Sequence, residues 1–327
     1  MNKKATINDV AKLAGVSITT VSRTINDNYP VKKETKEKIF KAIEILNFTP
    51  NELAVSMITK KTKTIGVVIP SISNAFFSTL VKGINEVVEK NNYTLLVCTS
   101  NNNEKEIVVK LVSRQVDGII IADGNLDSKK DFYNMIQKTI PLIFINSYDE
   151  NFNYVSCDQK KGAYDALNFL KEKGHQNVLF IRGNENSESY NLKEKIFCEV
   201  FEKNEILVVD SGNKDNAILN TKNDIVNFYE KNRNITGIFA CNDLMAVGVI
   251  KGLNHLKINI PNEVEVIGFD NTFLCELVAP TLSTVSQHIT TLGKISCEKI
   301  LQLIEKNDKI NVLINCDLVL RESCRLK

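Results

Sequence analysis

The chain has 327 residues, 43% of them hydrophobic, which suits about two or three domains with a large buried core. No apolar run approaches the roughly 20 residues of a membrane span, and the first residues lack the apolar segment of a secretory signal, so we expect a cytoplasmic protein with no membrane partner. The formal net charge is only +2, yet residues 1–64 hold 12 lysine and arginine residues against six acidic ones, a local excess that favours nucleic-acid binding.

Residues 6–26 predict two short helices joined by a tight turn at Gly15. Thr6 and Ser17 precede the two helical patterns and are residues favoured at N-caps. Two short helices with such a turn are typical of a helix-turn-helix reader of DNA. An ordinary helical hairpin with a polar outer face is the alternative, and the segment length, the glycine turn and the capping residues argue against it.

The outward face of the second helix carries the candidate base readers. Arg23 can make a bidentate contact to guanine, Thr19 can bond a base edge or a phosphate, and Ile18 can pack on a thymine methyl group. Ser22 and Asn26 more plausibly hold phosphates. The predicted contacts of this segment with double-stranded DNA are Thr6, Ser17, Ile18, Thr19, Ser22, Arg23 and Asn26.

A third helix is predicted over residues 34–46, and it closes a small core with the first two. The predicted core residues are Val10, Leu13, Val21, Ile25, Ile39, Ile43 and Leu46. Residues 48–51 break the helix, and residues 52–58 are too few to hold a helix without a partner. We therefore expect a DNA-binding headpiece over 1–49 and a hinge helix and linker over 50–63 that orders on DNA.

From residue 64 onward, short β-type runs alternate with amphipathic helical stretches, the pattern of parallel sheets built from βαβ units. Strands are predicted at 65–69, 94–98, 118–122, 142–145, 178–181, 237–241 and 264–269, and helices at 77–90, 161–172 and 244–256. The predicted fold is an all-α headpiece plus a two-lobed α/β body over 64–327. Its N-lobe is expected at about 64–158 and 287–310, and its C-lobe at about 159–286 and 311–327. Ligands of such folds bind where strand C-termini of the lobes face each other.

Catalytic, metal and cofactor signatures are missing from the sequence. The eight cysteines form no Cys-x-x-Cys pair and are interpreted as reduced, buried small hydrophobes. The three histidines, His175, His255 and His288, have no metal spacing and no neighbouring nucleophile. No dinucleotide or phosphate-loop motif follows a strand. We therefore expect neither an enzyme nor a bound cofactor or metal.

From Thr6 to Ser323 the chain resembles the lactose-repressor (LacI/GalR) family of bacterial transcription regulators. The matching motifs are Thr6-Ile7 with Asp9-Val10-Ala11, Gly15-Val16-Ser17, Thr20-Val21-Ser22-Arg23, Pro50-Asn51, Ile65-Gly66-Val67, Ser73-Asn74 with Phe76-Phe77, Val116-Asp117-Gly118, Asn242-Asp243, Val266-Ile267-Gly268-Phe269-Asp270 and Pro280-Thr281-Leu282-Ser283-Thr284-Val285. The resemblance implies a homodimer on a nearly palindromic operator and a body folded like periplasmic sugar-binding proteins. Effector in the cleft would change the pose of the lobes and the affinity for DNA.

The same resemblance implies further contacts with DNA and between subunits. Met57 stands where relatives insert a leucine into the minor groove, and an apolar wedge of this kind kinks the duplex; the alternative is that Met57 packs the two linkers together. Val55 stands where many relatives carry a basic residue. The helix predicted at 77–90 is expected to contribute to the dimer interface, and the chain ends without the heptads of a four-chain assembly.

For the effector site, the resemblance points to Asp270 and Asn242, each of which has a helix-capping alternative. Three positions differ from the pattern of relatives. Lys193 stands where relatives usually have an arginine, and Asn146 stands where they often have an aspartate. Lys214 lies near a position where relatives commonly have an aromatic residue. Two lysines favour an anionic effector such as a sugar phosphate over a neutral sugar, unless they simply face solvent. Ser73 and Phe76 follow the strand predicted at 65–69, where we expect the edge of the cleft. The predicted effector contacts are therefore Ser73, Phe76, Asn146, Lys193, Asn242 and Asp270.

Two other functions suit a two-lobed body. A secreted solute-binding protein would have the same lobes, but it would carry a signal peptide and no DNA reader. A regulator that responds to a protein partner rather than a small molecule is the other alternative, and the sequence leaves it open.

Overall fold

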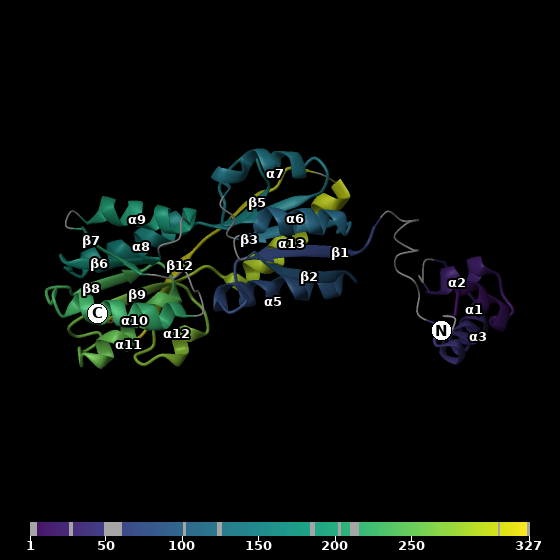
Figure 1. Ribbon diagram of the computed structural model, residues 1–327. Coiled ribbons are helices and arrows are strands. Elements are labelled where there is room, and N and C mark those ends of the chain that lie inside the picture. Colours follow the sequence, from purple (N-terminus) through teal and green to yellow (C-terminus); the bar gives the residue numbers. More distant parts are fainter. Residues whose placement is uncertain are drawn as a thin grey trace. The chain divides into compact units, whose positions relative to one another are not determined.

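The computed structural model describes most of the chain. The described residues are 5–25, 29–48, 61–100, 103–122, 126–183, 187–201, 204–209, 216–306 and 308–325. The chain divides into two compact units, Met1–Thr62 and Lys63–Lys327. Figure 1 shows helices alone in the described part of the first unit and two α/β lobes in the second, so the predicted fold class is confirmed.

The described helices of the first unit are α1 (Ile7–Ala14), α2 (Ile18–Ile25) and α3 (Lys33–Leu46). They enclose a small core of Val10, Ala11, Val21, Ile39 and Ala42. Leu13 was predicted in this core and is 50% exposed. The prediction is wrong because α1 packs through the stripe of Ile7, Val10, Ala11 and Ala14. Leu13 lies about 100° from the middle of this stripe around the helix axis.

The first lobe of the body is built on a six-stranded parallel sheet in the order β11-β5-β4-β3-β1-β2. Its strands are β1 (Thr64–Ile69), β2 (Thr94–Thr99), β3 (Gly118–Ala122), β4 (Leu142–Ile145), β5 (Tyr154–Cys157) and β11 (Asn311–Ile314). The central strand β3 is the run Gly-Ile-Ile-Ile-Ala and is buried throughout. Continuous apolar runs of this kind are typical of parallel strands covered on both faces.

The second lobe has a sheet in the order β12-β10-β9-β8-β6-β7, in which β12 is antiparallel to β10. Its strands are β6 (Val178–Gly183), β7 (Asn204–Val209), β8 (Gly237–Ala240), β9 (Glu265–Asp270), β10 (Ser283–Ser286) and β12 (Asp317–Val319). The seven predicted strands are all present within one or two residues. Strands β5, β10, β11 and β12 were not predicted, because they have three or four residues each, and β7 was not predicted because it begins with the polar residues Asn204 and Glu205.

Helices cover both faces of each sheet (Figure 1). The helical segments of the body are α5 (Ala75–Lys90), α6 (Glu104–Ser113), η1 (Asp127–Lys129), α7 (Lys130–Ile136), α8 (Gln159–Glu172), α9 (Glu188–Val200), α10 (Ala217–Tyr229), α11 (Asp243–His255), α12 (Leu274–Leu277) and α13 (Ile289–Lys306). Helices α5 and α13 approach so closely that a Cβ on Gly83 would lie 2.3 Å from the carbonyl oxygen of Thr290. Glycine is therefore required at this crossing. No helix within the described ranges is long and apolar enough to cross a membrane.

The chain crosses between the lobes at three places in the described residues: after β5, after β10 and after β11. Strand β11 pairs with β5 in the first sheet. The expected return to the C-lobe at residue 311 is therefore four residues too early, and the chain returns only at residues 315–316. A four-residue strand of alternating burial has no sequence signal for its partner sheet.

Candidate functional sites

The second helix of the first unit is positioned by the caps predicted from the sequence. Ser17 Oγ accepts a hydrogen bond from the backbone N–H of Thr20 at 3.1 Å, which begins α2. Gly15 has a φ of +67° between the helices, a conformation that glycine adopts without strain. Thr6 is the N-cap of α1, where its backbone N–H and its hydroxyl both donate to Asp9 Oδ2, at 2.8 and 2.7 Å.

The outward face of α2 presents the predicted readers to solvent. Ile18 is 49% exposed, and Thr19 and Arg23 are also exposed, whereas Ser22 is half-buried. The Arg23 guanidinium carbon lies 4.5 Å from the centroid of the Tyr29 ring, a cation–π contact. Sequence reasoning missed Tyr29, because the contact joins α2 to a residue beyond its end. Asn26 and Met57, which were also predicted to contact DNA, lie outside the described residues, as does most of the linker.

The body contains a cavity between the lobes with a volume of about 70 Å³. It lies where the strand-end rule places a ligand site: Asn146 follows β4, Asn242 follows β8, and Asp270 ends β9. Five of the six predicted effector contacts line it, namely Phe76, Asn146, Lys193, Asn242 and Asp270. The sixth, Ser73, is exposed and lines a separate surface depression beside Phe273.

Aromatic side chains form part of the cavity wall. Phe76 and Phe77 are both buried and both line the cavity, with ring centroids 5.1 Å apart in an edge-to-face arrangement. Tyr190 lies on the other lobe, and its hydroxyl accepts a hydrogen bond from Asn242 Nδ2 at 3.1 Å. Lys214, which the resemblance places near a common aromatic position, lies outside the described residues.

Lys193 is buried in the cavity wall at 2% exposure, so the alternative of a solvent-facing lysine is wrong. Its Nζ donates to Ser189 Oγ at 2.9 Å and to the Cys241 carbonyl at 3.1 Å. It also lies 3.8 Å from the centroid of the Phe269 ring. The Lys193 ammonium group therefore contacts residues on α9, on β9 and directly after β8, and it lies in the cavity wall.

Asn242 is the N-cap of α11, since its Oδ1 accepts from the backbone N–H of Met245 at 2.9 Å. The capping alternative for this residue is thus confirmed, and its Nδ2 faces Tyr190 in the cavity wall. Asp270 is not the cap of α12, which begins after Phe273. Its Oδ1 instead accepts from Gln287 Nε2 at 2.6 Å.

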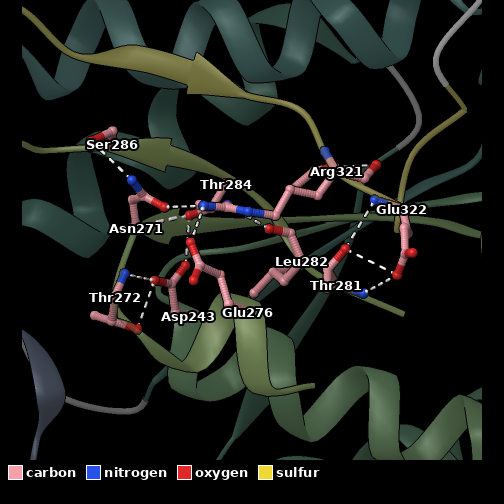
Figure 2. A network of polar contacts seen from close by, with 11 residues as sticks. Asp243, Asn271, Thr272, Glu276, Thr281, Leu282, Thr284, Ser286, Arg321 and Glu322 are labelled. Atoms are coloured by element: carbon pink, nitrogen blue, oxygen red, sulfur yellow. Dashed lines mark hydrogen bonds and ion pairs between the residues drawn. The ribbon is translucent and has the colours of Figure 1, made fainter. Parts of the chain in front are cut away.

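A buried network holds the loop that follows Asp270 (Figure 2). Asp243 Oδ2 accepts from the backbone N–H and the hydroxyl of Thr272, at 2.7 and 3.0 Å, and its Oδ1 accepts from the Thr284 hydroxyl at 2.6 Å. Burial raises the pKa of Asp243, against these hydrogen bonds, which lower it. Arg321 reaches from the end of the chain and donates to Asn271 Oδ1 at 2.9 Å. The loop is therefore fixed from both sides, which positions Asp270.

Sequence reasoning missed several polar cavity residues. These are Gln159, Ser187, Ser189, Tyr190 and Gln287. Gln287 comes directly after β10, and Gln159 begins α8 two residues after β5, where the chain leaves one lobe for the other. A polar residue just past a strand was the available signal, but the strands β5 and β10 were themselves unpredicted.

The cysteine prediction holds for six positions and differs at two. Cys157, Cys241, Cys275, Cys297, Cys316 and Cys324 are buried, Cys98 is half-buried and Cys198 is exposed. Burial raises the pKa of the Cys297 thiol to about 12, which keeps it in the neutral form. These residues therefore pack as small hydrophobes.

Comparisons with known proteins agree with both units. The profile of bacterial regulatory proteins of the lacI family matches residues 6–51, and the periplasmic binding protein-like domain matches residues 167–324. The catabolite control protein A of Priestia megaterium is 32% identical over 309 residues, covering 92% of this chain and 93% of that protein.

Solved structures show the same fold over the whole chain. A lac repressor dimer bound to operator and the anti-inducer ONPF has a TM-score of 0.88 at 24% identity, covering 99% of this chain and 100% of that chain. A periplasmic binding protein/LacI transcriptional regulator from Alkaliphilus metalliredigens, complexed with D-xylulofuranose, is 30% identical with a TM-score of 0.69, covering 80% and 99%.

Proposed function

The chain belongs to the lacI family of bacterial regulatory proteins and is a ligand-responsive transcriptional regulator, and on that premise we propose that it represses transcription as a homodimer on a nearly palindromic operator. The observation that carries the proposal is the exposed face of α2, where Ile18, Thr19 and Arg23 lie free to meet base edges. Its relative in Priestia megaterium is named as a control protein rather than an enzyme, and we propose no catalytic activity here. Repression would take place in the cytoplasm.

Selection from a random DNA pool tests the proposal directly. We expect the full chain to enrich an inverted repeat, because a two-fold dimer presents two copies of α2 to two half-sites about one or more helical turns apart. Affinity should also fall steeply with salt, as the basic first unit displaces counterions. A pool carried through the same rounds without protein is the control. Absence of any enriched motif at moderate ionic strength would contradict the proposal.

The cavity between the lobes is proposed to bind a carbohydrate or a sugar phosphate. Phe76 and Tyr190 provide aromatic surface, and Asp270 provides an acceptor for hydroxyl groups. The buried Lys193 adds a positive charge, which favours a phosphate or another anionic group on the effector. The Alkaliphilus metalliredigens relative was solved with the sugar D-xylulofuranose, which supports the carbohydrate class.

A thermal-shift screen of D-ribose, D-glucose, ribose 5-phosphate and glucose 6-phosphate tests this site. We expect at least one sugar phosphate to raise the unfolding temperature, since a ligand at 100 times its Kd stabilises by about 2.7 kcal/mol. Asp270→Ala should abolish the rise, whereas Asp131→Ala, which removes an exposed carboxylate of the other lobe, should leave it unchanged. Stabilisation by neutral sugars alone would contradict the anionic effector.

A further inference from the structure

Gln287 lies at the second of the three lobe crossings, between β10 and α13, and it is only 2% exposed. Its backbone is held on both sides of the crossing: its N–H donates to the Asp270 carbonyl at 3.3 Å, and its carbonyl oxygen accepts from Cys157 Sγ at 3.0 Å. Cys157 ends β5 at the first crossing. Two crossings therefore meet at this residue.

The side-chain amide of Gln287 joins the two lobes. Its Nε2 donates to Asp270 Oδ1 of the second lobe at 2.6 Å, and its Oε1 accepts from Asn146 Nδ2 of the first lobe at 3.0 Å. Oε1 also accepts from Gln159 Nε2 at 3.0 Å. This orientation of the amide is the one the neighbours require, because the carboxylate of Asp270 only accepts while both amide groups donate.

Asp270 and Asn146 are also the polar cavity groups, one from each lobe, proposed above to bind the effector. Gln287 thus occupies Asp270 Oδ1 and Asn146 Nδ2, two of the atoms that an effector hydroxyl could bond. A carboxylate that is 7% exposed gains strongly from a charge-assisted hydrogen bond, and loss of its donor is costly. An effector that bonds Asp270 Oδ1 and Asn146 Nδ2 therefore competes with the Gln287 side chain for these atoms.

We infer that Gln287 is a hinge residue that holds the two lobes against each other by bridging Asp270 to Asn146, and that an effector which bonds these two residues acts by replacing this bridge. The bridge itself does not depend on the proposed function. Its replacement by effector does, because that step requires the effector to bind in this cavity. A second contact between the lobes supports a closed body: Glu188 Oε1 on α9 accepts from the backbone N–H of Leu126 at 3.2 Å. Glu188 and Leu126 thus join the lobes away from the crossings.

Hydrogen exchange of the effector-free full chain, read by mass spectrometry, tests the bridge. Gln287→Met keeps the length of the side chain but removes its donor and acceptor. We expect exchange in peptides spanning residues 157–159 and 286–288 to accelerate about tenfold or more, with the core strand β3 unchanged. Asn146→Asp should accelerate the same peptides, because it removes the donor to Gln287 while tolerating the φ of +57° at this position.

Gln302→Met is the matched control. It makes the same side-chain change at a half-buried position of α13 and leaves the bridge between Asp270 and Asn146 intact, so exchange at the crossings should change less than about twofold. Unchanged exchange in Gln287→Met, or equal acceleration in the control, would overturn the inference. If Gln287→Met accelerates exchange throughout the body, including β3, then exchange at the crossings in Asn146→Asp decides whether the bridge exists. Neither DNA nor effector enters the measurement, so its failure is separate from failure of the proposed function.

Discussion

Replacing Arg23 with alanine is expected to weaken binding to the selected operator by about 1 to 3 kcal/mol, or roughly 5- to 160-fold, with a smaller loss on random DNA. The guanidinium is exposed on α2 and lies over the Tyr29 ring. The Tyr29 ring therefore orients the planar guanidinium group before the protein binds DNA, which favours a bidentate contact to guanine. Arg23→Lys keeps the charge but loses the fork, so it should retain the affinity for random DNA and lose discrimination.

Electrophoretic or anisotropy titrations of operator and random duplex, at two salt concentrations, measure this effect. Lys41→Ala is the matched control, because it removes the same charge from an exposed position of α3 without changing α2. The control should lower affinity for both duplexes alike and reduce the salt dependence. An equal loss on all sequences for Arg23→Ala would instead identify Arg23 as a phosphate anchor.

Glu265→Gln is expected to lower the free energy of unfolding of the body by about 3 kcal/mol at pH 7. Glu265 begins β9 and is fully buried. Its Oε1 accepts from Arg325 Nε at 2.6 Å, and its Oε2 lies 3.5 Å from His175 Nε2. Burial alone would raise the pKa of Glu265, but the neighbouring His175 and Arg325 side chains outweigh it and lower the pKa to about 2.

The pH dependence follows from the sign of this shift. The ordinary pKa of a glutamate is 4.5, so the stabilisation is fully present above about pH 4.5 and is lost as the pH falls toward 2. Urea unfolding of the wild type and of Glu265→Gln should therefore differ most at neutral pH and converge on acidification. Glu298→Gln, an exposed carboxylate on α13, should change stability by less than about 0.5 kcal/mol. A constant difference between pH 7 and pH 3 would contradict the assignment.

Glu265 lies on the strand that ends at the cavity between the lobes. The same strand β9 that begins with Glu265 ends with Asp270, and Arg325 lies in the final segment that runs alongside it. Within that segment Ser323 accepts from the Val266 N–H at 3.0 Å. Loss of the Glu265 pair should therefore loosen the end of the chain first.

Much of the first unit could be predicted because its structure depends on neighbours in sequence. The cap at Ser17, the turn at Gly15 and the outward face of α2 each follow from residues within four positions. The error at Leu13 arose from the same local view, since Leu13 is apolar but lies outside the stripe of α1 that packs against the rest of the first unit. The alternating strand and helix pattern likewise predicted a two-lobed α/β body.

The amino-acid sequence by itself determined the elements, the caps and the residue types at the strand ends, because hydrophobic period and capping chemistry are local properties. Only the tertiary structure decided which distant residues meet: the sheet that receives β11, the burial of Lys193, the pair of Glu265 with Arg325, and the bridge through Gln287. Gln287 and Asn146 are 141 residues apart in the chain. Contacts over such separations depend on how the three chain segments between the lobes lie relative to one another. No local sequence pattern encodes that arrangement.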